Sequence, residues 1–248
     1  MADIESTATG DLQGSRPPSY PPRDIRILGA GRFGYMAAER LGRRHPQSSF
    51  LVVDQNGEKL ERIRRDIGLP VLQGDAVAWL EEDGGPGDET WIIPAVPIHV
   101  AVQWLVGALN GRKGTGRHAY PIMVPEEADI QVPNPYRVPS GTLYASFATF
   151  LCPDICNEPD EICTHTGQPR PGNLFERLAA MRVAGFDTIV VRSWQLAPGV
   201  GGYPMASLRA VLGEIERKPG TYLIATCCRC HGVIDGLRWE ARTGPVFP

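Results

Sequence analysis

Long hydrophobic runs are missing from this sequence, and none approaches the roughly 18 apolar residues of a membrane-spanning helix. Its first residues, MADIESTATGDLQGS, are polar and acidic, so they lack the apolar segment of a secretory signal. An excess of basic residues is also missing: 25 Lys and Arg face 28 Asp and Glu, for a net charge of −3. We therefore expect a cytoplasmic protein with no membrane span and no nucleic-acid partner.

Common catalytic patterns are absent too. We find no Walker A sequence, no Ser-His-Asp pattern and no paired carboxylates of the glycosidase kind. The sequence therefore does not decide whether the chain is an enzyme; if it is one, we expect an NAD-dependent oxidoreductase. With 248 residues and 42% hydrophobic content the chain can bury a real core. We expect an α/β fold in three parts: a proline-rich disordered tail (1–22), a Rossmann domain (23–128) and a Cys-rich α/β domain (129–248).

The stretch DIRILGAGRFGYMAAERLGRR predicts a short strand, a G-x-G-x-x-G turn and a helix. Gly29 permits the tight turn after the strand, and Gly31 allows the backbone to approach a pyrophosphate without a Cβ in the way. Gly34 lets the helix pack closely, and the helix N-terminus attracts phosphate. Arg32 and Phe33 lie inside this turn and are candidate cofactor contacts.

A second strand, SFLVVDQN, ends in Asp54, twenty residues after Gly34. A carboxylate at this place accepts hydrogen bonds from ribose hydroxyls and repels a 2′-phosphate. The expected cofactor is therefore NAD(H), or another adenine nucleotide with a free 2′-hydroxyl. The βαβ alternation continues through a helix at GEKLERIRRDIGL, a strand, turn and helix at PVLQGDAVAWL, and a fourth strand at ETWIIPAV.

Three of these segments, ILGAGRFG, LVVDQNGEKLERIR and VLQGDA, resemble the TrkA-N or RCK nucleotide-binding domains of potassium-transport regulators. The resemblance covers residues 24–82, and the pair Gly74-Asp75 is typical of that family. It implies binding of NAD(H) or ATP/ADP, with Asp75 near the nucleotide. In that family the domain is usually a sensor, whereas this chain continues into a cysteine-rich region. We also expect a homo-oligomer or a subunit of a larger complex.

The six cysteines form two clusters far apart in the sequence. Cys152, Cys156 and Cys163 lie in FLCPDICNEPDEICTHTG, and the others lie in ATCCRCHG. We predict that GTLYASFATFLC is a strand ending at Cys152 and that TYLIAT is a strand ending at the second cluster. If these strands share a sheet, the loops after them meet at one edge. The two clusters are then halves of one metal site.

Cys152, Cys156, Cys163 and Cys230 are the expected ligands, with Cys228 and His231 as alternates. Thiolates bind both Zn²⁺ and iron, so a [4Fe–4S] cluster or zinc is expected, with a slight preference for iron–sulfur beside a nicotinamide site. The spacing matches neither a standard zinc ribbon nor a ferredoxin. Two alternatives stay open: thiols without a metal, some of them buried, and a reversible thiol–disulfide switch.

A second glycine-rich segment, APGVGGYP, follows the predicted strand TIVV and precedes a helix beginning near Pro204. A strand, glycine loop and helix can hold an anion, so Gly199–Gly202 is a candidate site for an anionic small molecule. A plain tight turn explains these residues equally well.

Two hypotheses follow. The first is an NAD(H)-binding redox protein with a cysteine-ligated iron–sulfur or zinc centre, acting as an oxidoreductase or a redox sensor. The second is a non-enzymatic RCK-like regulator of the potassium-transport type, with a structural zinc in its second half.

Overall fold

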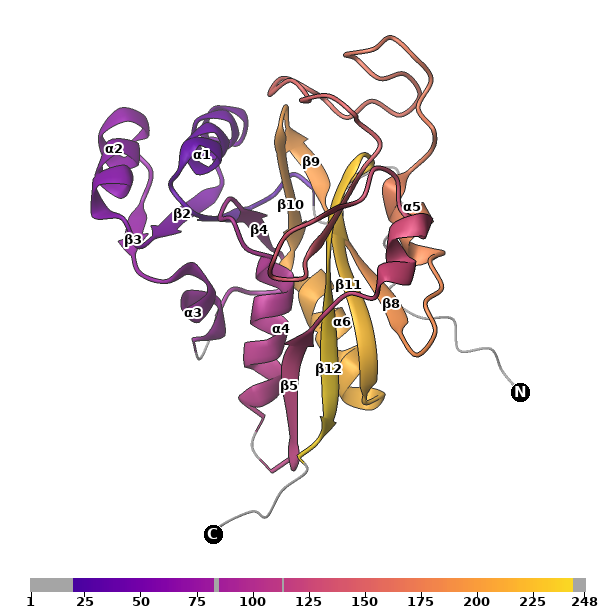
Figure 1. Cartoon of the computed structure of the whole chain (residues 1–248). Helices are drawn as coiled ribbons and strands as arrows, with labels where there is room; N and C mark the ends of the chain where they lie inside the picture. The colour runs from indigo at the N-terminus through magenta and orange to yellow at the C-terminus, as the bar shows by residue number, and fades with distance from the viewer. Residues whose placement is uncertain (1–19, 83–84, 113, 243–248) are drawn as a thin grey trace.

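The computed structural model describes residues 20–82, 85–112 and 114–242. Two six-stranded sheets lie roughly side by side, with helices between them and on their outer faces (Figure 1). The predicted tail, residues 1–22, falls almost wholly outside the described residues. Within the described residues, no helix has the length and apolar character that crossing a membrane requires.

The first sheet begins as a parallel Rossmann sheet in the order β3-β2-β1-β4. Helices follow the first three strands because apolar residues there recur at helical spacing, and Gly68 ends α2 with φ of +80°. The predicted α/β fold with a parallel Rossmann sheet is thus confirmed. In chain order the elements are β1 (Asp24–Leu28), α1 (Arg32–Arg44), β2 (Ser49–Asp54), α2 (Gly57–Ile67), β3 (Val71–Gln73), α3 (Ala76–Glu81) and β4 (Thr90–Pro94).

A hairpin from late in the chain completes this sheet. Strand β10 (Val200–Pro204) pairs antiparallel with β4, and β9 (Trp194–Ala197) pairs with β10. Helix α6 (Met205–Arg217) follows directly, with Pro204 as its N-cap. The nucleotide-binding half is therefore built from both ends of the sequence.

The second sheet is mixed. Strands β8 and β11 are parallel, while β12 runs antiparallel to β11, β5 and β7. Helix α4 (Val100–Asn110) packs on its inner face, and α5 (Leu174–Ala179) packs on its outer face. The remaining elements are β5 (Arg117–Ile122), a 3-10 helix (Glu126–Gln131), β6 (Tyr136–Arg137), β7 (Leu143–Ser146), β8 (Asp187–Arg192), β11 (Gly220–Cys227) and β12 (His231–Ala241).

One hydrophobic core joins the two sheets. Leu28 and Ile92 of the first sheet share it with Ile224 and Leu237 of the second, and Trp104 of α4 lies between them. The predicted boundary between residues 128 and 129 stays a prediction, and strand pairing crosses it in both directions: β5 belongs to the second sheet and β9–β10 to the first.

Two predicted elements are wrong. The strand expected to end at Cys152 ends at Ser146, so Cys152 lies in a loop. The expected flexible loop at Gly199–Gly202 is the β9–β10 hairpin, in which Gly201 and Gly202 are strand residues. A Cβ on Gly202 would come within 2.6 Å of the Ile92 carbonyl oxygen. Close packing on β4 explains Gly202, whereas a Cβ on Gly201 would meet Ser193 and one on Gly199 the Asp154 carbonyl. The segment is thus not the strand, loop and helix that the sequence suggested, and the anion site stays a prediction.

Candidate functional site

The glycine turn between β1 and α1 has the geometry that its sequence predicts. Gly29 has φ of +107°, and a Cβ there would lie 2.6 Å from the Ala95 carbonyl oxygen. A Cβ on Gly34 would collide with the Gly29 carbonyl, so Gly34 allows the helix to approach the turn. A Cβ on Gly31 would meet no atom within 4 Å. The turn is therefore open at the one glycine that a phosphate would approach.

Asp54, the predicted ribose-binding residue, forms hydrogen bonds with the backbone next to the glycine turn. Asp54 Oδ2 accepts a hydrogen bond from the Ala30 amide at 2.6 Å, and Oδ1 accepts one from the Asn56 amide at 2.7 Å. Asp54 therefore lies beside the turn, where a ribose is expected in a Rossmann fold. Gly74 donates its amide to the Asp54 carbonyl at 3.0 Å.

Asp75 acts as the N-cap of α3. Its Oδ1 accepts hydrogen bonds from the amides of Val77 and Ala78, both at 2.9 Å, and its Oδ2 accepts one from Gln55 Nε2 at 2.8 Å. These hydrogen bonds, led by that of Ala78, lower the pKa of Asp75 despite an opposing effect of burial. The Gly74-Asp75 pair thus has a local structural role next to Asp54.

Arg32 and Phe33 lie exposed at the start of α1, with 57% of Phe33 accessible. The Arg32 guanidinium does not point to empty solvent: its Nη2 lies 2.7 Å from Asp154 Oδ2 in the cysteine loop. We define the cysteine loop as residues 147–173, between β7 and α5. An arginine inside the phosphate-binding motif is therefore paired with a carboxylate of the loop that carries three of the thiols.

Further contacts hold the cysteine loop against the nucleotide half. Arg40 of α1 donates from Nη1 to the carbonyls of Asp154 and Pro198, the latter at 2.5 Å. The Cys156 carbonyl accepts the Gly199 amide at 3.0 Å and Gln195 Nε2 at 2.6 Å. In Figure 1 the loop lies at the top of the view, above β9 and β10.

The two cysteine clusters meet at one edge of the second sheet, as expected, because β7 and β11 both run antiparallel to β12 and therefore end at the same edge. Cys227 ends β11, and Cys228 and Cys230 lie in the turn between β11 and β12. His231 links the clusters, because its Nε2 is 3.4 Å from Cys152 Sγ and its Nδ1 is 3.9 Å from Cys228 Sγ. Cys227 is buried in the core beside α5, as a small hydrophobic residue would be.

The thiols differ in their surroundings. Burial raises the pKa of Cys152, that of Cys230 to about 11, and that of Cys228 still more strongly. Hydrogen bonds to Thr166 lower the pKa of Cys163. Repulsion from Cys156 also raises the pKa values of Cys152 and Cys230, and repulsion from Cys163 raises that of Cys152.

Arg170 lies among these sulfur atoms. It lowers the pKa values of Cys152, Cys163 and Cys230 electrostatically. Its Nε and Nη2 atoms are buried and have no hydrogen-bond partner in the described part of the chain. Buried arginine donors require an acceptor, and thiolates or a negatively charged thiolate centre would supply one.

The side chains around Arg170 do not form a ready metal site. Among residues 20–82, 85–112 and 114–242, no group of three or more His, Cys, Asp or Glu side chains is arranged to hold a metal ion. The ligand set Cys152, Cys156, Cys163 and Cys230 therefore stays a prediction. The loop itself contains neither helix nor strand beyond an isolated bridge between Ile162 and Pro169.

One potential acid–base group was not found from the sequence. His99, the N-cap residue of α4, is buried, with Nδ1 2.9 Å from Asp235 Oδ2 and Nε2 2.8 Å from Thr226 Oγ1. The loop leading to it, Ala95–Ile98, packs against Gly29 of the nucleotide turn. A carboxylate, an imidazole and a hydroxyl in this order can relay a proton. Separations of 136 and 127 residues in the sequence hid this arrangement.

Comparison with known proteins matches the two parts of the chain to two different families. The TrkA-N domain family matches residues 25–79. A protein of Archaeoglobus fulgidus, described as an uncharacterized protein, is 27% identical over 231 residues, which are 86% of this chain and 98% of the relative. A second family, described as "Uncharacterized protein, C-terminal domain", matches residues 101–240, more than half of the 248 residues. The chain therefore belongs to the family defined by this C-terminal domain and joins it to a TrkA-N nucleotide-binding domain.

Proposed function

We propose that this chain is an NAD(H)-binding redox protein whose nucleotide site and cysteine centre act on each other. The observation that carries the proposal is the ion pair between Arg32, in the glycine turn, and Asp154, in the cysteine loop. A nucleotide pyrophosphate at the turn would compete with Asp154 for the Arg32 guanidinium. Occupancy of the turn would then loosen the loop that carries Cys152 and Cys156.

The same proposal assigns the cysteine centre to Cys152, Cys156, Cys163 and Cys230, with Cys228 and His231 as alternates. Its support is the half-buried Arg170, whose Nε and Nη2 atoms are buried and have no partner in the described residues. Four thiolates around Zn²⁺ or a [4Fe–4S] cluster carry net negative charge, and Arg170 would donate to their sulfur atoms. The loop would have to rearrange to bring the four sulfur atoms to one centre.

If the chain is an oxidoreductase, His99 would accept the proton that is released together with hydride transfer. An alcohol oxidised by NAD⁺ gives up a hydride to the nicotinamide and a proton to a base. His99 Nε2 would receive that proton through the Thr226 hydroxyl, and Asp235 would stabilise the resulting imidazolium. The position of His99 behind the Ala95–Ile98 loop is what favours this role.

The link between the two sites is tested by thiol labelling. In the full chain, binding of NADH should raise the labelling rate of loop thiols severalfold. Asp154→Asn should abolish this effect and strengthen NADH binding up to about fivefold, because an exposed pair is worth up to about 1 kcal/mol. Glu161→Gln, which removes the same charge from the same loop, is the matched control.

Equal labelling with and without bound NADH would overturn the coupling, whereas failure of the wild type to bind any adenine nucleotide would overturn the nucleotide assignment. Metal content and the visible absorption of anaerobically purified protein test the centre separately. Iron with a broad visible band supports the cluster, zinc supports the zinc form, and thiols without a metal would refute both.

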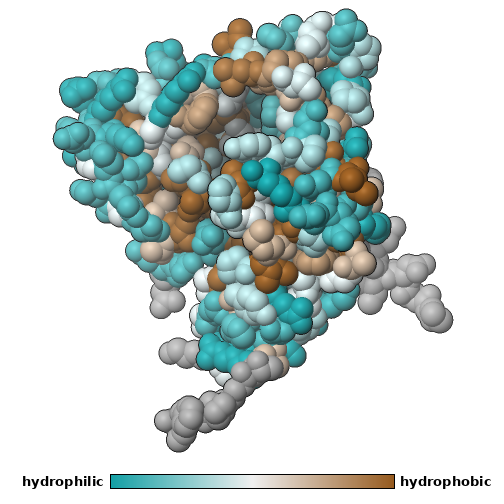
Figure 2. Space-filling model, in the orientation of Figure 1, coloured by the Kyte–Doolittle hydropathy of each residue, from teal (hydrophilic) through white to brown (hydrophobic). Residues whose placement is uncertain are grey.

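The second candidate is a nucleotide-sensing regulator with a structural zinc. The observation favouring it is the exposure of Leu151, Ile155 and Ile162 in a loop without regular structure, which has little buried apolar surface to hold it. Figure 2 shows apolar surface gathered at the top of the view, where the loop lies. In this case Cys156→Ser should unfold the loop and leave nucleotide affinity unchanged; loss of a turnover activity from a folded variant would contradict it.

A further inference from the structure

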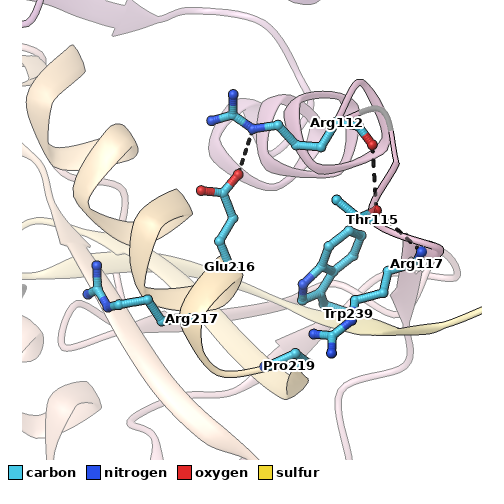
Figure 3. Close-up of a pocket in the computed structure, with 7 residues that line it drawn as sticks. All are labelled: Arg112, Thr115, Arg117, Glu216, Arg217, Pro219 and Trp239. Carbon is cyan, nitrogen blue, oxygen red and sulfur yellow. Dashed lines mark hydrogen bonds and ion pairs between the residues drawn. The ribbon is translucent and has the colours of Figure 1, made fainter.

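A pocket of about 540 Å³ lies at the opposite end of α4 from the nucleotide turn. Its wall is formed where α4 passes into β5, where α6 passes into β11, and by one residue of β12 (Figure 3). Its volume falls within the range of small-molecule sites. The lining residues are Arg112, Thr115, Arg117, Glu216, Arg217, Pro219 and Trp239.

The pocket is strongly basic in a chain whose net charge is −3. Arg112 Nε lies 2.6 Å from Glu216 Oε1, and that ion pair uses the one carboxylate among the lining residues (Figure 3). Arg117 and Arg217 form no ion pair within the part of the chain that the structure describes. In Figure 3 the Arg117 guanidinium lies beside Trp239, whereas that of Arg217 extends to the other side of α6.

Trp239 provides an independent observation. Its side chain is 2% exposed, and its indole Nε1 is buried with no hydrogen-bond partner among the described residues. A buried indole N–H usually finds an acceptor, and leaving it without one is unfavourable. Trp239 lines the same pocket as the arginines and lies between Glu216 and Arg117 in Figure 3.

Helix geometry explains only part of this arrangement. Arg112 follows the end of α4 and Arg217 lies in the last turn of α6, where the helix dipole favours cations. Arg117 begins a β-strand, and the Trp239 indole is uncharged, so neither gains from a helix end. The three arginines and Trp239 all carry N–H donors, whereas Glu216 is the one carboxylate among the lining residues.

We infer that this pocket is a binding site for a small oxyanion-bearing molecule, either a phosphorylated compound or a polycarboxylate. Arg117 would bind its phosphate or carboxylate oxygens through the paired N–H groups of its guanidinium. The Trp239 indole would donate to a further oxygen, and Arg112 would stay paired with Glu216. The site is separate from the nucleotide turn and does not depend on the function proposed above.

Calorimetric titration of the full chain at fixed ionic strength tests this inference, with pyrophosphate and citrate as separate probes. Preference for one probe decides between the phosphorylated and the polycarboxylate ligand. Arg117→Gln should raise the Kd about tenfold, since charge-assisted hydrogen bonds are lost, whereas Arg217→Gln, whose guanidinium extends to the other side of α6, should change it much less. Lys218→Gln, which removes the same charge next to the pocket from a residue paired with Asp187, should change the Kd less than twofold.

The indole N–H resonance of Trp239, assigned with Trp239→Phe, should shift on binding. Loss of probe binding in Arg32→Gln would show that the probe binds at the nucleotide turn and not at this pocket. The inference is overturned if neither probe binds, if binding survives Arg117→Gln unchanged, or if Arg32→Gln alone removes it.

Discussion

The three glycines of the turn have different physical roles, and two substitutions separate them. Gly31→Ala places a methyl group in open space, so the free energy of unfolding should change by less than about 0.5 kcal/mol. The same methyl group should obstruct the approach of a pyrophosphate and weaken NADH binding at least tenfold. Gly34→Ala forces a Cβ into the Gly29 carbonyl and should destabilise the fold by about 1–3 kcal/mol.

Urea unfolding and NADH titration of both variants check this prediction. An unstable Gly31→Ala protein, or one that binds NADH as the wild type does, would contradict it.

For single residues, the sequence predicted the roles that depend on neighbours within the same motif. The roles of Gly29, Gly31 and Gly34 follow from a motif within six positions, and the structure has the geometry they require. The pairing of Arg32 with Asp154 joins residues 122 positions apart, and no local pattern encodes it. The unpartnered donors of Arg170 are hidden for the same reason.

At the scale of elements, the hydrogen bonds of His99 join α4 to the second sheet. Thr226→Val keeps the shape of the side chain but leaves His99 Nε2 without its partner in a buried place. We expect a loss of about 1–3 kcal/mol in the free energy of unfolding. Thr226→Ser keeps the hydroxyl and should recover most of that loss. Urea unfolding of the two variants measures the difference, and equal stability of Val and wild type would refute the contribution of this bond.

The contact between α3 and α4 gives a pH dependence. Glu81 of α3 packs against Gly107 of α4, and burial raises its pKa above the ordinary value of 4.5, with repulsion from Asp75 adding to the effect. A raised pKa in the folded chain means that the protonated form is favoured by folding. This contribution is complete below the ordinary value and is lost as the pH rises through the folded value.

Glu81→Gln removes the ionisable group, so the variant does not lose this stability as the pH rises. Because Glu81 is largely exposed, water weakens this effect, so near neutral pH the variant should be more stable than the wild type by no more than about 0.5 kcal/mol, and at about pH 3 the two should be equal. Thermal unfolding across this range, with Glu82→Gln as the matched control, measures the difference. A constant difference at every pH would show that Glu81 titrates as it does in the unfolded chain.

Elements were predictable where periodicity is local and strong, as in α1, α2 and β4. The hairpin β9–β10 was missed because its glycines are typical of a loop, whereas Gly202 is required by close packing on β4, about 110 residues earlier in the sequence. The strand before Cys152 was drawn too long, since aromatic and β-branched residues continue past Ser146 although pairing with β12 stops there.

For the whole molecule, the shared core means that the predicted Rossmann domain should not fold by itself. Residues 23–128 contain β1 to β4 but not β10, which pairs with β4, nor α6, which covers it. Trp104 and Leu105 of α4 would lose the apolar residues of α6 and of the second sheet that they pack against. Apolar surface from one of three core clusters would face water, and a small domain cannot offset such a loss.

We therefore expect the fragment 23–128 to show no cooperative urea transition and no measurable NADH binding under conditions where the full chain shows both. Adding residues 187–217 as a separate polypeptide, which supplies β8, β9, β10 and α6, should restore part of the helical signal. A fragment 23–128 that unfolds cooperatively and binds NADH with the affinity of the full chain would contradict this. In that case the hairpin and α6 would be additions to a complete nucleotide-binding domain, and the boundary at residue 128 would mark a real division of the chain.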